Sequence, residues 1–169
     1  VFPKDTSTDK DHMVELLVEA AKNGDADKVK SLLEDGVDVN GEQVEYYNGI
    51  ICHSATALHY AASASIAKVL IKAGANIEAR DNSGRTPLIS LSNSQSGQPF
   101  GAVKELIEAG ANIEARDEHG FTALGMAALY GHADIVNELI EAGAQVNTRS
   151  DCGFTKTINE NGEKVTTYH

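Results

Sequence analysis

Apolar residues recur at helical spacing in pairs of segments along most of the chain, and each pair is separated from the next by a polar stretch. The first pair begins at Asp11, a residue type that caps helix N-termini, and ends at Gly36, where glycine allows a left-handed cap. Similar helix endings follow at Gly74, Gly110 and Gly143, at intervals of about 33 to 38 residues. A period of this length predicts a stack of helix pairs.

The repeat is also visible in the amino acids themselves. AGANIEARDNSGRTPL (residues 73–88) and AGANIEARDEHGFTAL (residues 109–124) agree at most positions. One such unit cannot bury its own apolar face, whereas a stack buries a continuous core whose stability is a sum of contacts between neighbours. We therefore expect a polar lead-in, four helix-pair units, a final connecting loop and a tail. Their approximate ranges are 1–10, then 11–36, 37–74, 75–110 and 111–143, then the loop up to 155, and 156–169.

The second unit departs from this pattern in two ways. Its leading loop is enlarged, because Asn40 to Thr56 spans sixteen positions whereas Glu114 to Thr122 spans eight. Its helical part is three residues shorter than the fourth unit, although the pattern still predicts a first helix over 57–62. The enlarged loop at 41–55 is too apolar to be merely solvated, so it either folds back on the stack or is held ready for a partner. The apolar residues concerned are Tyr46, Tyr47, Ile50 and Ile51.

The third unit and the C-terminal tail also differ from the regular repeat. In the third unit the turn between the helices, residues 93–101, is lengthened and has the composition of a loop. In the tail, Asn161-Gly162 separates two stretches rich in Thr, Ile and Val. This pattern predicts a β-hairpin instead of a fifth helix pair, either closing the stack or remaining as the stub of a longer protein.

Several short motifs at the matching spacing resemble the ankyrin repeat. They are TALH at 56–59, TPLI at 86–89, TALG at 122–125, Gly131-His132, and ELIEAGAQVN at 138–147. The resemblance covers roughly residues 11–155. It implies an all-α ankyrin-repeat solenoid, here with one enlarged finger loop and the C-terminal hairpin; a finger is the loop that connects one helix pair to the next. It also implies structural hydrogen bonds for His59 and His132.

The formal net charge of −11 makes nucleic acid and anionic membranes unfavourable partners. The charge either serves solubility alone or is tuned to a basic protein partner. No apolar run is long enough to cross a bilayer, so we expect a soluble protein that is a monomer alone. Two distant cysteines favour a reducing, cytoplasmic setting, and the start at Val1 leaves export to the periplasm after leader removal as the alternative.

Residues that could carry chemistry are not arranged in a reactive pattern. His53 beside Cys52, and His119 near Asp117, would bind a metal only if distant segments converged on them. Cys152 and Ser150 have no histidine in a defined relation to them, and the glycines do not form a phosphate-binding motif. We expect no cofactor, no metal and no catalytic site.

The resemblance instead implies binding of a protein partner on the concave strip, which comprises the finger tips and the inner faces of the first helices of each pair. Phe121 and Phe154 serve there as interface anchors or pack between fingers. The predicted binding residues are Tyr46, Tyr47, Ile50, Ile51, Asn82, Ser83, Arg85, Asn93, Ser94, Glu118, His119, Phe121, Leu129, Tyr130, Asp151 and Phe154, with Cys152 beside them. The function expected is a non-catalytic protein-interaction module. The alternatives are an inhibitor or immunity protein that neutralises a basic enzyme or toxin, and the targeting segment of a larger effector or enzyme.

Overall fold

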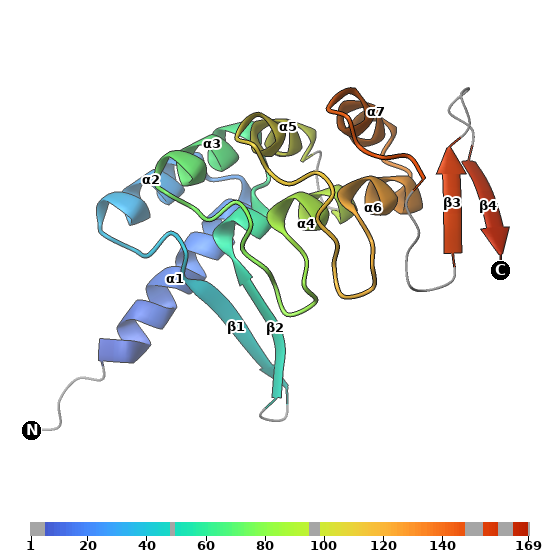
Figure 1. Cartoon of the computed structure of the whole chain (residues 1–169). Coiled ribbons are helices and arrows are strands. Elements are labelled where there is room, and N and C mark those ends of the chain that lie inside the picture. Colours follow the sequence, from blue (N-terminus) through green and yellow to red (C-terminus); the bar gives the residue numbers. More distant parts are fainter. Residues whose placement is uncertain (1–5, 48–49, 95–98, 148–153, 159–163, 169) are drawn as a thin grey trace, which may run out of the picture.

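The helices of this protein form two rows (Figure 1). The computed structural model describes residues 6–47, 50–94, 99–147, 154–158 and 164–168. The inner row consists of α1 (Thr6–Asn23), the 3₁₀ helix η1 (Ala57–Tyr60), α4 (Pro87–Asn93) and α6 (Ala123–Tyr130). The outer row consists of α2 (Ala26–Glu34), α3 (Ala64–Lys72), α5 (Phe100–Glu108) and α7 (Ala133–Glu141). Each helix contacts its neighbours in its row and its partner in the other row, which confirms the predicted stack of helix pairs.

The hydrophobic core lies between the two rows. Leucines at equivalent positions of successive units are buried there: Leu58, Leu88 and Leu124 in the inner row, and Leu70, Leu106 and Leu139 in the outer row. Burying one leucine side chain contributes about 1.5 to 3 kcal/mol. Because the same position recurs in each unit, the core continues from unit to unit along the stack.

The helix ends follow the predicted chemistry. Thr122 caps α6 by accepting a hydrogen bond from the Gly125 N–H, and Asp25 and Thr86 cap α2 and α4 in the same way. After α5, Gly110 adopts φ +87°, and the N–H of the next residue, Ala111, donates back to the Leu106 carbonyl. The ends of α2, α3 and α7 have the same geometry. Only glycine adopts this left-handed conformation at little cost, which explains the periodic glycines.

Helix α1 begins at Thr6, five residues before the expected start at Asp11. Residues 6–10 of the expected lead-in are therefore helical, and residues 1–5 lie outside the described part of the chain. No proline or glycine interrupts the chain between Pro3 and the end of α1. In addition, Asp9 in the first turn suits the positive end of the helix dipole.

The enlarged loop of the second unit contains a β-hairpin, a structure that the sequence pattern was not used to predict. Strands β1 (Glu42–Tyr47) and β2 (Ile50–Thr56) pair antiparallel, with a bulge between Glu45 and Tyr46. The residues are β-branched and aromatic at many positions, and Asn48-Gly49 stands between the strands in the sequence. Strand β1 also contacts α1, so the hairpin is attached to the stack.

The first helix of the second unit is likewise shorter than predicted. The pattern over 57–62 indicates an ordinary helix, but η1 is a single 3₁₀ turn that ends at Tyr60. The chain then leaves the inner row, and the Ala62 N–H donates to the Ala21 carbonyl of α1. The three missing residues of this unit leave too little chain to complete an α-helix before the outer helix begins.

The predicted C-terminal hairpin is confirmed. Strands β3 (Phe154–Ile158) and β4 (Lys164–Tyr168) pair antiparallel, from Phe154 opposite Tyr168 to Ile158 opposite Lys164. The Asn161-Gly162 turn itself lies outside the described residues. The architecture is thus a helical repeat stack with two small antiparallel hairpins.

Candidate functional site

The finger tips are shaped by two buried aspartates. In the fourth finger, Oδ1 of Asp117 accepts hydrogen bonds from the His119 and Phe121 N–H groups, each at 2.9 Å. The Asp117 N–H donates to the Phe121 carbonyl, which closes the tip. Asp81 makes the equivalent bonds in the third finger. Sequence reasoning did not identify these aspartates, although D-x-x-G-x-T occurs at 81–86 and again at 117–122.

Adjacent fingers are joined through their backbones. The Asn82 N–H donates to the Ser54 carbonyl of β2, and the Ser54 N–H donates to Oδ1 of Asn82, both at 3.3 Å. The Glu118 N–H donates to the Ser83 carbonyl at 3.1 Å. The β1–β2 hairpin and the third and fourth fingers therefore form one connected surface, which lies on one side of the inner row (Figure 1).

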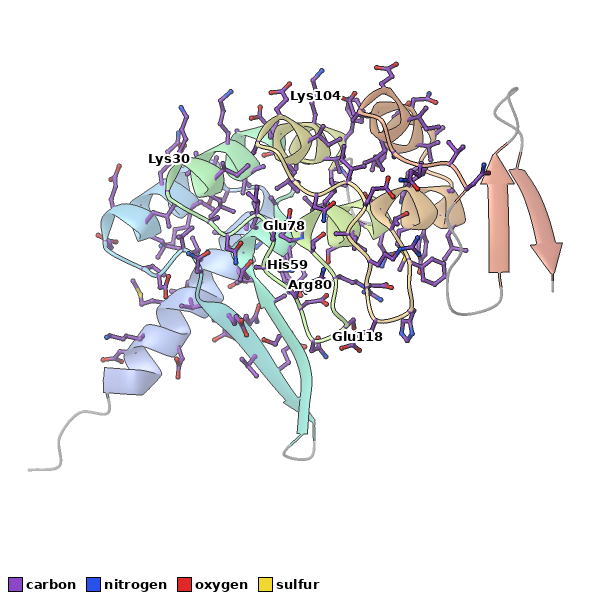
Figure 2. The ribbon with its side chains drawn as sticks, viewed as in Figure 1. Lys30, His59, Glu78, Arg80, Lys104 and Glu118 are labelled. Carbon is purple, nitrogen blue, oxygen red and sulfur yellow. The ribbon has the colours of Figure 1, made fainter. Side chains whose placement is uncertain are left out.

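Arginine side chains add a second set of links between fingers. Nη1 of Arg80 donates to the Gly84 carbonyl of its own finger and to the Arg116 carbonyl of the next. Figure 2 shows Arg80 among the fingers. Nε of Arg85 lies 3.9 Å from Oδ2 of Asp117, and both atoms are buried without a hydrogen-bond partner among the described residues. The Arg85–Asp117 contact is therefore an ion pair without a hydrogen bond.

The structural role predicted for His59 is confirmed. Its side chain is buried, and Nδ1 accepts a hydrogen bond from the Thr56 N–H at 3.3 Å and lies 2.9 Å from the Thr56 hydroxyl. Nε2 lies 3.1 Å from the Arg85 carbonyl, a pure acceptor. These partners assign the ring as neutral, with its proton on Nε2. His59 thus fastens the second unit to the third.

The resemblance implied a hydrogen bond from His132 to a neighbouring loop. This prediction is wrong for Nε2, because that atom is buried without a hydrogen-bond partner among the described residues. Its ring instead stacks on the Tyr130 ring, with centroids 6.5 Å apart and an interplanar angle of 18°. The backbone N–H of His132 donates to the Ala127 carbonyl, so the residue helps to end α6 through its main chain. The histidine therefore supports the position of Tyr130.

Six of the predicted binding residues of the third and fourth units fall into three settings. Asn82, Glu118 and His119 are exposed at the finger tips. Phe121 is half-buried and packs against the core, which favours the packing alternative for this aromatic residue. At the end of α6, two large apolar side chains remain exposed, Leu129 at 44 % and Tyr130 at 42 %.

The predicted residues at the two hairpins are placed only by their backbones. In the first hairpin, Tyr46 pairs with Ile51 and Tyr47 pairs with Ile50 near the tip. Phe154 is the first residue of β3. Asp151 and Cys152 lie outside the described residues.

A pocket of about 250 Å³ lies beside η1, between the inner row and the fingers. Asn93 and Ser94, both predicted to bind a partner, line it together with Arg85. Lys22 and Tyr60 also line it, and the Lys22 ammonium lies 4.2 Å from the centroid of the Tyr60 ring. Sequence reasoning missed Lys22 and Tyr60. The only feature of the sequence that could have indicated a pocket here is the shortened second unit.

The electrostatic surroundings of Tyr60 shift its titration. Burial raises the pKa of Tyr60 to about 12, and the nearby carboxylates of Glu45 and Asp81 add to the shift. Each effect disfavours the tyrosinate anion. Tyr60 is therefore a neutral phenol at physiological pH, and its uncharged ring faces the Lys22 ammonium.

Among the described residues, no three or more His, Cys, Asp or Glu side chains come together as they would at a metal site. His119, one of the predicted candidates, is exposed at a finger tip. No described helix has both the length and the apolar character that crossing a membrane requires.

Repeated helix pairs, periodic glycine caps and linked fingers define a helical repeat solenoid. The family model described as ankyrin repeats (3 copies) matches the chain over residues 17–117 and 66–150, so the chain belongs to the ankyrin-repeat family. Ankyrin repeats are generally protein–protein interaction modules and are typically non-catalytic. A search of curated proteins finds no match to this chain.

Proposed function

We propose that the protein is a non-catalytic binding module that holds one partner protein along the concave strip. The strip runs from the β1–β2 hairpin over the third and fourth fingers to the end of α6. The residues proposed to contact the partner are those predicted from the sequence, with Phe121 in a supporting position because it packs against the core.

The observation that carries this proposal is the pair of exposed apolar side chains on the last turn of α6. Leu129 and Tyr130 are adjacent and 44 % and 42 % exposed, whereas the other apolar residues of α6 are buried. Aromatic side chains with a polar tip are enriched among residues that dominate binding energy. The Tyr130 ring also lies nearly parallel to the His132 ring, with the ring centroids 6.5 Å apart.

The links between fingers support the same proposal. Two backbone–backbone hydrogen bonds, and one from the Ser54 N–H to the Asn82 side chain, connect the hairpin and both fingers. A surface that is ordered before binding loses less conformational entropy on association. The strip is therefore suited to recognise a partner of fixed shape.

A second candidate function is inhibition of a basic enzyme or toxin, and the net charge of −11 favours it. A charge of this size accelerates association with a basic partner through long-range attraction. Salt screens that attraction, so the association rate should fall steeply as ionic strength rises, with little change in dissociation. An association rate independent of salt would exclude a charge-steered inhibitor while leaving the binding module itself intact.

Site-specific photocrosslinking tests where the partner binds. A benzophenone side chain is placed at Leu129 in one variant and at Lys104 in another, and both are irradiated in extracts of the source cells. Lys104 lies on the outer helix α5 and points away from the stack (Figure 2). We expect one protein to be crosslinked through position 129 and not through position 104. Crosslinking of the same protein from both positions, or from 104 alone, would overturn the assignment to the concave strip.

A further inference from the structure

We propose that the pocket beside η1 binds a carboxylate side chain, from a glutamate or aspartate of the partner protein. This inference rests on the proposed function, because the pocket opens on the same strip. There it would bind an acidic side chain of the partner. Lys22 of α1 and Arg85 of the third finger are the groups that would recognise the carboxylate.

The pocket exists because the second unit is short. Helix η1 has 4 residues, whereas the inner helices α4 and α6 have 7 and 8. The chain therefore leaves the inner row early at Tyr60, and the space that a longer helix would fill stays open between Lys22 and Asn93. Its volume of about 250 Å³ lies below the range of roughly 300 to 1,000 Å³ typical of sites for drug-sized ligands. A single side chain is the occupant of matching size.

The described lining residues include several hydrogen-bond donors, two cationic side chains and one carboxylate. Two cationic side chains, Lys22 and Arg85, border the pocket, and Asn93 adds an amide group. Lys22 stands over the uncharged Tyr60 ring and has no carboxylate within ion-pair distance among the described residues. Because a carboxylate accepts hydrogen bonds only, it is complementary to these groups.

The one carboxylate among the described lining residues already accepts hydrogen bonds. Oδ1 of Asp81 accepts two hydrogen bonds of 2.9 Å, from the N–H groups of Ser83 and Arg85. Oδ2 of Asp117, in turn, is 3.9 Å from Nε of Arg85, too far for a hydrogen bond to that atom. A partner carboxylate would meet the Lys22 and Arg85 cations, with Asp81 in the lining and Glu45 near Tyr60 as the opposing negative charges.

A pair of matched probes tests this assignment without the partner. N-acetyl-glutamate methylamide is titrated into the full chain at physiological salt and followed by NMR, with the uncharged N-acetyl-glutamine methylamide as its control. We expect saturable shifts centred on Lys22, Tyr60 and Asn93 with the glutamate probe only. Equal shifts from both probes, shifts centred elsewhere, no saturation, or preferential binding of an N-acetyl-lysine methylamide would each overturn the proposal.

A charge-removing variant adds a second readout. Lys22→Met should weaken binding of the glutamate probe roughly threefold, the size expected for loss of a partly exposed ion pair. Lys104→Met, on the outer helix, should leave it unchanged, and circular dichroism confirms that both variants are folded. Equal affinity of the two variants would contradict the role of Lys22. Failure of the probe to bind, together with crosslinking at Leu129, would reject the carboxylate pocket and keep the binding module.

Discussion

At the scale of single residues, the fingers depend on side chains that sequence reasoning assigned to no role. Asp81 and Asp117 are buried, and each uses one carboxylate oxygen to hold two backbone N–H groups of its finger tip. Asp117 also faces the Arg85 guanidinium of the preceding finger. These carboxylates set the shape of the surface that the partner is proposed to contact.

Asp117→Ala should destabilise the protein by about 2 to 3 kcal/mol, because it leaves partly buried N–H groups without their acceptor and the Arg85 guanidinium without its counter-charge. Urea denaturation measures the free energy of unfolding. The exposed neighbour Glu118 provides the control, and Glu118→Ala should change the value by no more than about 0.5 kcal/mol. If the two substitutions cost the same, the organising role of Asp117 is wrong.

Tyr60 makes stability depend on pH in the alkaline range. Its folded pKa is about 12, whereas an unfolded tyrosine releases its proton near pH 10. The unfolded state therefore loses this proton first, and the stabilisation present below pH 10 is lost as the pH rises towards 12. Tyr60→Phe keeps the ring under Lys22 but removes the ionisable group. Between pH 10 and 12 the wild type should lose more stability than Tyr60→Phe, and parallel curves would contradict the raised pKa.

At the scale of helices and turns, glycines at two kinds of position should respond oppositely to the same substitution. Gly110 ends α5 at φ +87°, where an added Cβ has free space but a strained backbone. Gly125 lies inside α6, and a Cβ there would touch Phe121 and Thr122 at ordinary distances of 3.5 and 3.6 Å. The cost at Gly110 is thus purely conformational.

Gly110→Ala should destabilise the protein by about 1 to 2 kcal/mol, the cost of a left-handed conformation in an L-residue. Gly125→Ala should stabilise it by up to about 1 kcal/mol, because alanine favours the helix. Thermal unfolding of the two variants in one buffer provides the comparison. Destabilisation of equal size in both would show that packing, and not backbone conformation, decides these positions.

The regular elements were predictable because their signals are local. Threonine and aspartate caps, and a glycine at the end of each outer helix, are read directly from neighbouring residues. The β1–β2 hairpin also had a local signal, Asn48-Gly49 between apolar stretches, but its length made it resemble an irregular insertion. The start of α1 was placed late because polar residues alone mark its first turn.

The features that were not predictable depend on contacts between units. Helix η1 has an apolar helical pattern, yet its length is set by how much chain remains before α3. The pocket between Lys22 and Asn93 arises because the second unit is three residues shorter than the fourth. Whether such a gap closes is decided only by the packing of neighbouring units. Of the candidate site, the exposed residues Leu129 and Tyr130 were placed on the inner row as expected, whereas Phe121 packs against the core.

At the scale of the whole molecule, the exposure of apolar residues follows from position in the stack. Ile107 near the end of the third unit and Ile113 just after that unit pack against the core. The residues at the equivalent positions one repeat later, Ile140 and Val146, are 37 % and 36 % exposed. Leu129 and Tyr130 differ from these two, because they belong to the inner row, at the end of α6. This contrast provides matched apolar positions inside and outside the concave strip.

The most direct measurement of the central claim is the affinity of the crosslinked partner for two alanine variants, determined by calorimetry. Tyr130→Ala should raise the dissociation constant at least about tenfold, as expected for a buried aromatic anchor. Ile140→Ala, which removes a similarly exposed apolar side chain from the outer row, should change it by less than about twofold. Both variants must first be shown to be folded. An unchanged affinity for Tyr130→Ala, or a larger loss for Ile140→Ala, would contradict binding on the concave strip.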